Sequence, residues 1–290
     1  MTELSASVQI NALKFQRETY QIIAALLLLL IVLGLPISLR DEAGRIDKMV
    51  SLDEVVNSST MDLPIVWGNL GERLIASGVI DKQKFENLLQ QPMPQLVDGK
   101  SGRVTITRDN AGTVLNYLWA LGLANKSKIL EAGDMQKTGV DLSRLASLGA
   151  WRIGSGPALN HYSKHELIQL NDSQQALVDK LSRSIYRPCC NNSTHFPDCN
   201  HGMAMLGLLQ LMVSQNFSEA EIYRTALIAN AYWFGSSYGT INAVRSKWFG
   251  SQQAAPEILL RPEYSSALAI KKFNAIAPPL DQPRSSCALK

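Results

Sequence analysis

Charge of either sign is scarce in this chain, and no long basic segment occurs. Charged residues make up 18% of the sequence, and 28 Lys and Arg against 25 Asp and Glu give a formal net charge of only +3. Proteins that bind DNA or RNA usually present a basic patch or stripe, often interleaved with aromatic residues. Aromatic residues are also few, at 7%. The composition therefore argues against a nucleic acid partner.

The sequence also lacks several catalytic motifs. It has no His-Glu-x-x-His of a zinc protease and no Cys-x-x-Cys of a thioredoxin-like enzyme. The pair Gly154-Ser-Gly156 lacks the lysine and the strand–helix context of a phosphate loop. No pair of carboxylates suggests acid–base catalysis. These absences favour a binding protein over an enzyme but leave the choice open.

One long apolar run is present near the N-terminus. The segment Ile22–Leu39 carries no charge and has the length that a helix needs to cross a bilayer core. A cleaved signal peptide is the alternative, but its apolar region is usually shorter and is followed by a small-x-small cleavage site. This run ends in Leu39-Arg40-Asp41-Glu42 without such a site. We therefore expect an uncleaved single-pass anchor in the cell membrane.

The orientation of this anchor is less strongly encoded. Lys14 and Arg17 precede the run, and Arg40, Arg45 and Lys48 follow it, so the positive-inside signal is nearly balanced. Large domains can be translocated largely regardless of charge. We expect a short cytoplasmic tail and a bulk that lies outside the cytoplasm.

The remainder of the chain predicts a mainly α fold, with a single transmembrane helix followed by a mostly helical extracytoplasmic domain. Apolar residues recur at helical spacing, Asp198 is a candidate helix N-cap, and Ser218-Glu-Ala-Glu221 forms a capping box. The predicted helices are 66–77, 81–90, 109–123, 172–186, 198–215 and 219–234, with a strand at 103–107. The predicted organisation is a tail at 1–21, the span at 22–39, a juxtamembrane linker at 40–63, the helical domain at 64–273 and a mobile tail at 274–290.

Histidine and cysteine are rare but strongly clustered. All four histidines and three of the four cysteines lie between residues 161 and 201. These side chains bind soft and borderline metals and also supply redox and nucleophilic groups. The chemistry of the protein is therefore expected in the segment 161–205.

Two of the histidines, His161 and His165, are four residues apart. On a helix this spacing places both imidazoles on one face, as bidentate metal sites require. Two histidines on a solvated surface turn would give the same spacing, so the pattern alone is weak.

Cys199 and His201 fall at the start of the helix that Asp198 is expected to cap. The partial positive charge of a helix N-terminus stabilises a thiolate, which is the form that binds a metal. Met203 and Met205 lie one turn further on, and a Cys, His and Met set suits copper. The methionines also fit an ordinary core stripe with Leu208, Leu209 and Met212.

Cys189 and Cys190 are adjacent and precede the loop that leads to Cys199. Because successive side chains diverge, we expect only one of the pair to join Cys199 at a metal. The alternative is a structural disulfide from Cys189 or Cys190 to Cys199, which fits an oxidising compartment.

The segment 172–222 resembles the PCYCGC-motif proteins, which are small exported bacterial proteins, often membrane-anchored. The resemblance rests on Ile185-Tyr-Arg-Pro-Cys-Cys190, Asp198-Cys-Asn-His-Gly202 and Gln215-Asn-Phe-Ser-Glu-Ala-Glu-Ile222. Here an adjacent cysteine pair replaces alternating cysteines, and Met203 and Met205 replace the cysteine pair after His-Gly. The resemblance implies an extracytoplasmic Cys/His site for a metal, involving Cys189, Cys190, Cys199 and His201.

These observations predict a membrane-anchored protein that binds copper or zinc in a carrier or redox role. The predicted ligands are Cys199 and His201 with Cys189 or Cys190, completed by His161 or His165, whereas His195 lies in mid-loop and is the weakest candidate. A structural or interaction domain held by a disulfide is the second hypothesis. A thiol–disulfide oxidoreductase with Cys199 as the attacking thiolate is the third. The sequence does not identify a protein partner.

Overall fold

The computed structural model describes residues 51–89, 92–96, 101–249 and 254–277, which belong to one compact unit, Met49–Lys290. The predicted membrane span, Ile22–Leu39, lies outside these residues, as do the tail from residue 278 onward and Cys287. Among the helices that are described, none is both long and apolar enough to cross a bilayer.

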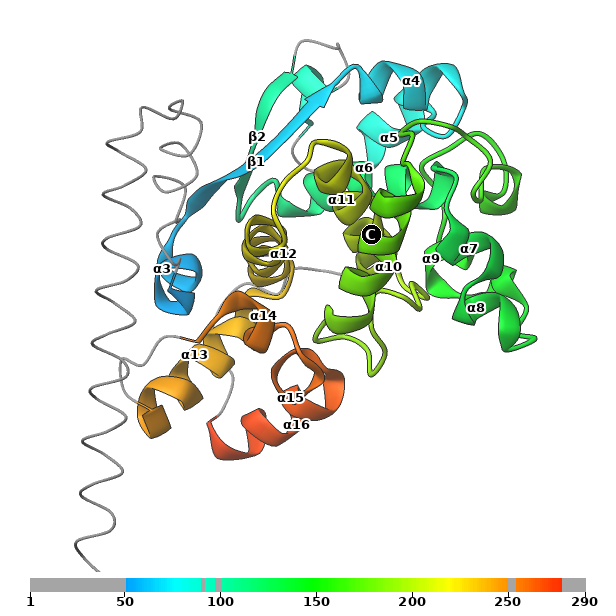
Figure 1. Ribbon diagram of the computed structural model, residues 1–290. Helices are drawn as coiled ribbons and strands as arrows, with labels where there is room; N and C mark the ends of the chain where they lie inside the picture. The colour runs from blue at the N-terminus through cyan, green and yellow to red at the C-terminus, as the bar shows by residue number, and fades with distance from the viewer. Residues whose placement is uncertain (1–50, 90–91, 97–100, 250–253, 278–290) are drawn as a thin grey trace, which may run out of the picture. The chain divides into compact units, whose positions relative to one another are not determined.

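The fold is mainly α, as the sequence predicts, and it also contains a small two-stranded sheet (Figure 1). The strands are β1 (Thr60–Gly68) and β2 (Ser101–Thr107). The longer helices are α6 (Ala111–Ala124), α10 (Asp172–Ser184), α11 (Asn200–Ser214), α12 (Glu219–Trp233), α13 (Gly235–Phe249) and α16 (Ala267–Ile276). The shorter ones are α3 (Leu52–Asn57), α4 (Leu70–Ala76), α5 (Lys82–Leu88), α7 (Lys128–Ala132), α8 (Asp134–Lys137), α9 (Ala146–Gly149), α14 (Pro256–Leu259) and α15 (Pro262–Ser265). Single 3-10 turns lie at Pro94–Leu96, Leu142–Arg144 and Ala158–Asn160.

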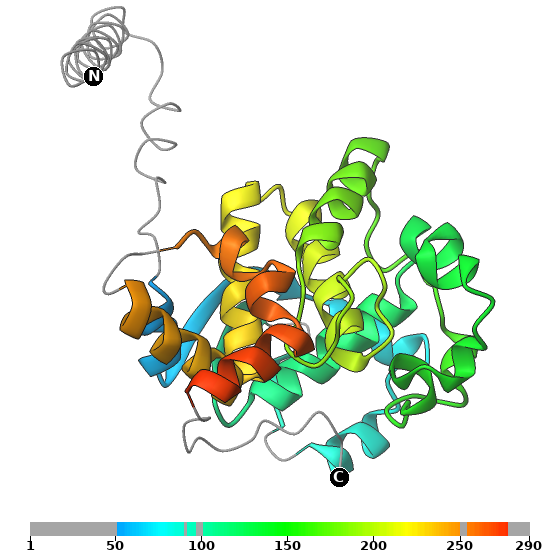
Figure 2. The ribbon, with the colours of Figure 1, turned by 90° about the horizontal axis from the view of Figure 1, so that it is seen from below.

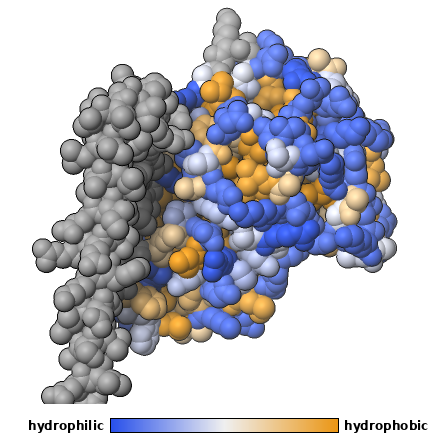
Figure 3. Space-filling model, in the orientation of Figure 1, coloured by the Kyte–Doolittle hydropathy of each residue, from blue (hydrophilic) through white to orange (hydrophobic). Residues whose placement is uncertain are grey.

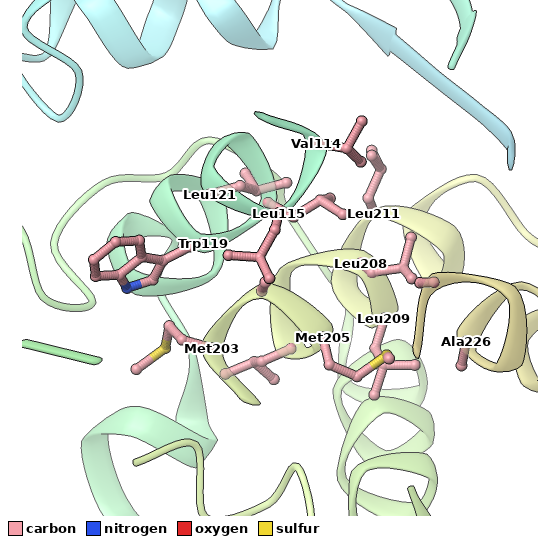
Figure 4. Packing of buried hydrophobic residues seen from close by; sticks show 14 of the residues in the cluster. Val114, Leu115, Trp119, Leu121, Met203, Met205, Leu208, Leu209, Leu211 and Ala226 are labelled. Carbon is pink, nitrogen blue, oxygen red and sulfur yellow. The ribbon is translucent and has the colours of Figure 1, made fainter. Parts of the chain in front are cut away.

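The centre of the core is the packing of α6 against α11, with α10 and α12 flanking α11. Both central helices are buried on nearly all sides, which agrees with their apolar composition. Figure 4 shows the leucines of the two helices interleaved, with Met203 and Met205 among them. The exposed fractions of these two methionine side chains are 0% and 1%. They therefore belong to the core stripe that the sequence offered as the alternative to a metal-ligand role.

Two glycines set the distance between α6 and α11. A Cβ on Gly122 would lie 2.0 Å from the carbonyl oxygen of Met203, and a Cβ on Gly207 would lie 2.4 Å from that of Leu118. No side chain fits at such distances, so the backbones approach closely only because both positions lack one. This crossing fixes α11, which carries Cys199 at its N-terminal end.

Some elements differ from the prediction. Residues 66–68 form the end of β1 rather than a helix, because the segment Thr60–Gly68 pairs antiparallel with β2 and its register shifts between Leu63 and Val66. Trp67, which falls within the predicted helix 66–77, lies in β1 instead, and its side chain is buried. The predicted strand at 103–107 lies within β2. Hydrogen bonds to a partner strand far along the chain decide the conformation here, and local spacing does not reveal them.

Two further segments form regular secondary structure that their composition does not predict. The second half of the predicted linker forms α3 and the start of β1, and α3 buries Leu52, Val55 and Val56. Helix α13 begins in a Gly- and Ser-rich stretch with little helical propensity, yet it buries Tyr238 and Ile241 and packs beside α16 (Figure 2). In both segments tertiary burial outweighs a polar or helix-poor sequence.

Hydrophilic residues cover much of the described face shown in Figure 3.

We predict that Gly122→Ala and Gly207→Ala each destabilise the fold by about 1–3 kcal/mol, the usual range for an overpacked core. Gly112→Ala is the matched control, because Gly112 lies in the same helix and an added Cβ would meet no atom within 4 Å. It should be neutral or stabilising by up to about 1 kcal/mol, since Ala is the better helix former. Urea unfolding measures all three, and equal effects at Gly112 and Gly122 would contradict the close crossing.

Candidate metal centre

The cysteine pair lies in a loop between α10 and α11 whose two arms run antiparallel to each other. Tyr186 bridges to Ser193, and the amide of Thr194 donates to the carbonyl of Ile185 at 2.8 Å. At the tip, the amide of Cys190 donates to the carbonyl of Arg187 at 3.2 Å and closes a β-turn. Proline is favoured at the second position of such a turn, and Pro188 occupies it.

The turn brings both thiols of the pair to the same place. The Sγ atoms of Cys189 and Cys190 are 3.3 Å apart. The expectation that only one of two adjacent cysteines could face the site is therefore wrong. It holds for extended backbone, where successive side chains point to opposite faces, but the chain reverses here.

The third thiol comes from the start of α11. Cys199 is the N-cap of this helix, and its Sγ accepts a hydrogen bond from the amide of Gly202 at 3.3 Å. Asp198, predicted as the cap, lies one residue earlier and has another role. The helix thus begins at Asn200 and presents a sulfur to its own free amides, which favours the thiolate form.

The three sulfur atoms form a compact triangle. Cys199 Sγ lies 3.7 Å from that of Cys189 and 3.6 Å from that of Cys190. All three are free thiols. Among the Cys, His, Asp and Glu residues that the structure describes, this trio is the group whose ligand atoms converge closely enough to hold a metal ion.

A buried arginine organises the triangle. Arg187 is 1% exposed, and its Nε donates to Cys199 Sγ at 3.0 Å. Its two terminal nitrogens donate to the Asp198 carboxylate at 2.5 Å and to the Asn192 side-chain oxygen at 2.6 Å, as well as to three carbonyls of the loop. Asn192 also donates to the second oxygen of Asp198 at 2.9 Å. All five guanidinium donors are therefore used to hold the 190–199 loop around one cation.

Gly202 makes room for this arginine. A Cβ at Gly202 would lie 2.7–2.9 Å from three atoms of the Arg187 guanidinium. The flat group thus packs directly against the first turn of α11. Sequence reasoning missed Arg187 because nothing in its local pattern signals burial. The sequence does contain one signal of this ion pair. Arg187 and Asp198, which carry opposite charges, lie at the two ends of the cysteine loop.

The surroundings shift the pKa values of the Cys199 and Cys189 thiols in opposite directions. Hydrogen bonds from Cys189 and Cys190 lower the pKa of the Cys199 thiol well below its usual value, and the Arg187 cation and a hydrogen bond with His201 add to this effect. The bonds to its two neighbours, together with burial, raise the pKa of the Cys189 thiol. Cys199 is therefore the member of the trio that loses its proton most readily.

The four histidines lie at three different places. His201 is 2% exposed, contacts Phe234 with ring centroids 4.2 Å apart, and acts on Cys199 through the hydrogen bond noted above. Its ligand atoms lie outside the convergent cysteine group. His201 therefore lies on the core side of the cysteine group and contacts it through its hydrogen bond with Cys199.

His161 and His165 form a pair of their own. Their facing ring nitrogens are 3.1 Å apart, and the other nitrogen of His161 lies 3.0 Å from the carbonyl oxygen of Ser155. Burial and the neighbouring His161 lower the pKa of His165. The predicted spacing does bring the two imidazoles together, but within a loop, and neither is a member of the convergent cysteine group.

His195 holds the cysteine loop to the rest of the domain. It is 3% exposed, and its two ring nitrogens lie 2.9 Å from carboxylate oxygens of Asp134 and Asp179. These contacts connect the loop to α8 and α10. The imidazole forms part of the lining of a pocket of about 390 Å³ beside α7 and α10.

One catalytic pattern occurs at Gly235-Ser-Ser-Tyr-Gly239, which matches the Gly-x-Ser-x-Gly of serine hydrolases. The pattern requires a strand, a sharp turn and a helix to expose the serine. Here it follows α12 and forms the first turns of α13. The match therefore carries no catalytic implication.

Comparisons with known proteins identify no relative. No family model matches the chain, and no curated protein or solved structure resembles it significantly.

We predict that Arg187→Met destabilises the fold by about 3–5 kcal/mol, because it leaves the Asp198 carboxylate and the loop carbonyls without their cation. Arg261→Met is the control, since the Arg261 side chain is 51% exposed and pairs with Glu257, four residues earlier. That surface pair should be worth less than about 1 kcal/mol. Denaturant unfolding compares the variants, and similar losses would contradict the structural role of Arg187.

Proposed function

We propose that this protein binds a thiophilic metal ion through Cys189, Cys190 and Cys199. The observation that carries the proposal is the convergence of three free sulfur atoms, 3.3–3.7 Å apart. Cysteine residues that serve only as core thiols have no reason to meet in this way. Copper and zinc, the two metals expected from the sequence, both accept thiolate ligands.

The accessibility of the site supports a carrier role over a purely structural one. Structural zinc sites are closed by four protein ligands, whereas this group contributes three. Cys189 is exposed, so an ion has a route in and out on that side. An ion held by three sulfurs and open on one side can exchange with a partner that offers further ligands.

The remaining part of the proposal places this site at a membrane. It rests on the apolar run Ile22–Leu39, which is long enough to span a bilayer. In this arrangement the metal-binding domain follows the anchor and lies outside the cytoplasm.

The structural-disulfide hypothesis is less well supported. No disulfide joins the described cysteines, and the loop is already held by the Arg187 network and by His195. The oxidoreductase hypothesis retains the lowered pKa of the Cys199 thiol as support. Disulfide exchange requires a second cysteine to resolve the mixed disulfide. Among the described residues, that cysteine would have to come from the same three.

Cadmium titration tests metal binding, because sulfur-to-metal charge transfer gives an ultraviolet band that reports thiolate ligation. The full chain in detergent, fully reduced, should bind one cadmium ion per molecule with such a band. Cys199→Ser should weaken binding by about 100-fold, since it removes one ligand from a preorganised set.

Cys287→Ser is the matched control, because it removes the fourth cysteine of the chain, which is not one of the three proposed ligands. It should bind cadmium as the unmodified chain does. The proposal is refuted if the unmodified chain shows no charge-transfer band, or if the two serine variants behave alike.

Carbonate extraction of membranes tests the anchor. The full chain should stay in the pellet, and a variant lacking residues 22–39 should be released, because the apolar run supplies the insertion energy. Release of the unmodified chain by carbonate, or a mature N-terminus that begins after residue 39, would show that the run is not an anchor.

A further inference from the structure

We propose that the site is selective for trivalent thiophilic ions of the arsenite class, which bind three sulfurs on one side. This inference rests on the proposed function and narrows the chemical class of its ligand. Three independent features carry it: the size of the sulfur triangle, the number of ligands and the charge of the surroundings.

The triangle is too small for planar coordination. Its sides of 3.3, 3.6 and 3.7 Å place each sulfur about 2.0 Å from the common centre, shorter than a metal–sulfur bond of about 2.3 Å. An ion at that bond length sits about 1 Å above the plane. Planar coordination, which suits monovalent copper, would require sulfurs about 4.0 Å apart at the same bond length.

The backbone resists expansion of the triangle. Cys189 and Cys190 are consecutive residues of one closed turn, and the carbonyl of Cys190 accepts a hydrogen bond from the amide of Ala267 at 3.0 Å. Cys199 is held from the other side by the Gly202 amide and by Arg187. The fold therefore favours an ion that sits above the plane of the three sulfurs over one that lies within it.

The ligand number fits an ion that needs no fourth donor. Among the described residues, no carboxylate or imidazole atom joins the three sulfurs within the group. Tetrahedral zinc would have to recruit a fourth ligand from solvent, or from His201, which hydrogen-bonds Cys199 but would have to move to reach the ion. A trivalent arsenic or antimony centre is complete with three sulfurs, because a lone pair occupies the fourth direction.

The surrounding charge fits a trivalent ion. Arg187 is paired with Asp198 at 2.5 Å, so this ion pair contributes no net charge. The three thiolates carry three negative charges among themselves and require three positive charges for a neutral complex. Zinc would leave one negative charge and monovalent copper two, and uncompensated charge beside a buried ion pair is costly.

The binding reaction is balanced without a redox partner. Arsenous acid, As(OH)₃, reacts with three cysteine thiols, so three As–O bonds break and three As–S bonds form. The three thiol protons leave with the three hydroxyl groups as three water molecules. No electron is transferred, and arsenic stays trivalent throughout.

Arsenite titration of the reduced full chain in detergent tests this inference. Native mass spectrometry should show one added arsenic with loss of three hydrogens per molecule. The number of titratable thiols should fall from the four of the sequence to one. Arsenite should also displace cadmium from the loaded protein, whereas zinc at equal concentration should displace less.

Two variants make the result specific. Cys199→Ser should retain only a two-thiol adduct and lose affinity for arsenite by about 100-fold. Cys287→Ser should bind arsenite unchanged and lose all of its titratable thiols.

The outcomes separate this inference from the proposed function. Cadmium binding without a three-thiol arsenite adduct, or zinc displacing cadmium better than arsenite does, would overturn the trivalent selectivity and leave the metal site intact. Absence of binding by both cadmium and arsenite would overturn the proposed function as well. An arsenite adduct that consumes Cys287 or only two thiols of the unmodified chain would also overturn the inference.

Discussion

The burial of a single guanidinium group is the constraint on which the cysteine site depends. Arg187 is 1% exposed, so each of its donors must find an acceptor within the protein. It finds them in the loop carbonyls, in Asn192 and Asp198, and in the Cys199 sulfur. The loop from 190 to 199 has little apolar content of its own, and this network is what gives it a defined path. A cation enclosed in this way also stabilises a thiolate at its edge.

Helix α11 joins this network to the core. Its middle is held against α6 by the close approach at Gly122 and Gly207, and its N-terminus presents Cys199 and Gly202 to Arg187. A small displacement of α11 would therefore move the sulfur relative to the other two. Because interiors are close-packed and hardly deform, the position of Cys199 depends on the hydrophobic core as well as on the Arg187 network of the loop.

Much of the fold and part of the site follow from the sequence. Apolar spacing and caps predict α6, α10, α11 and α12, since these helices bury a continuous stripe or carry a clear cap such as the Ser218–Glu221 box. The gathering of cysteine and histidine correctly singles out the segment that contains the three convergent thiols. What local pattern cannot show is distance between segments. The pairing that makes 60–68 a strand, the turn that brings Cys189 and Cys190 together, and the burial of Arg187 all depend on such distances. For the same reason His161 and His165 were expected beside cysteines from which the fold keeps them separate.

The central claim is that three sulfur atoms of this chain form one ligand set. X-ray absorption at the edge of the ion bound to the full-length protein tests it most directly, because the first coordination shell reports the number and type of neighbouring atoms. Three sulfur neighbours at about 2.3–2.6 Å, according to the ion used, are the result that the account predicts. A first shell made only of oxygen and nitrogen would contradict it.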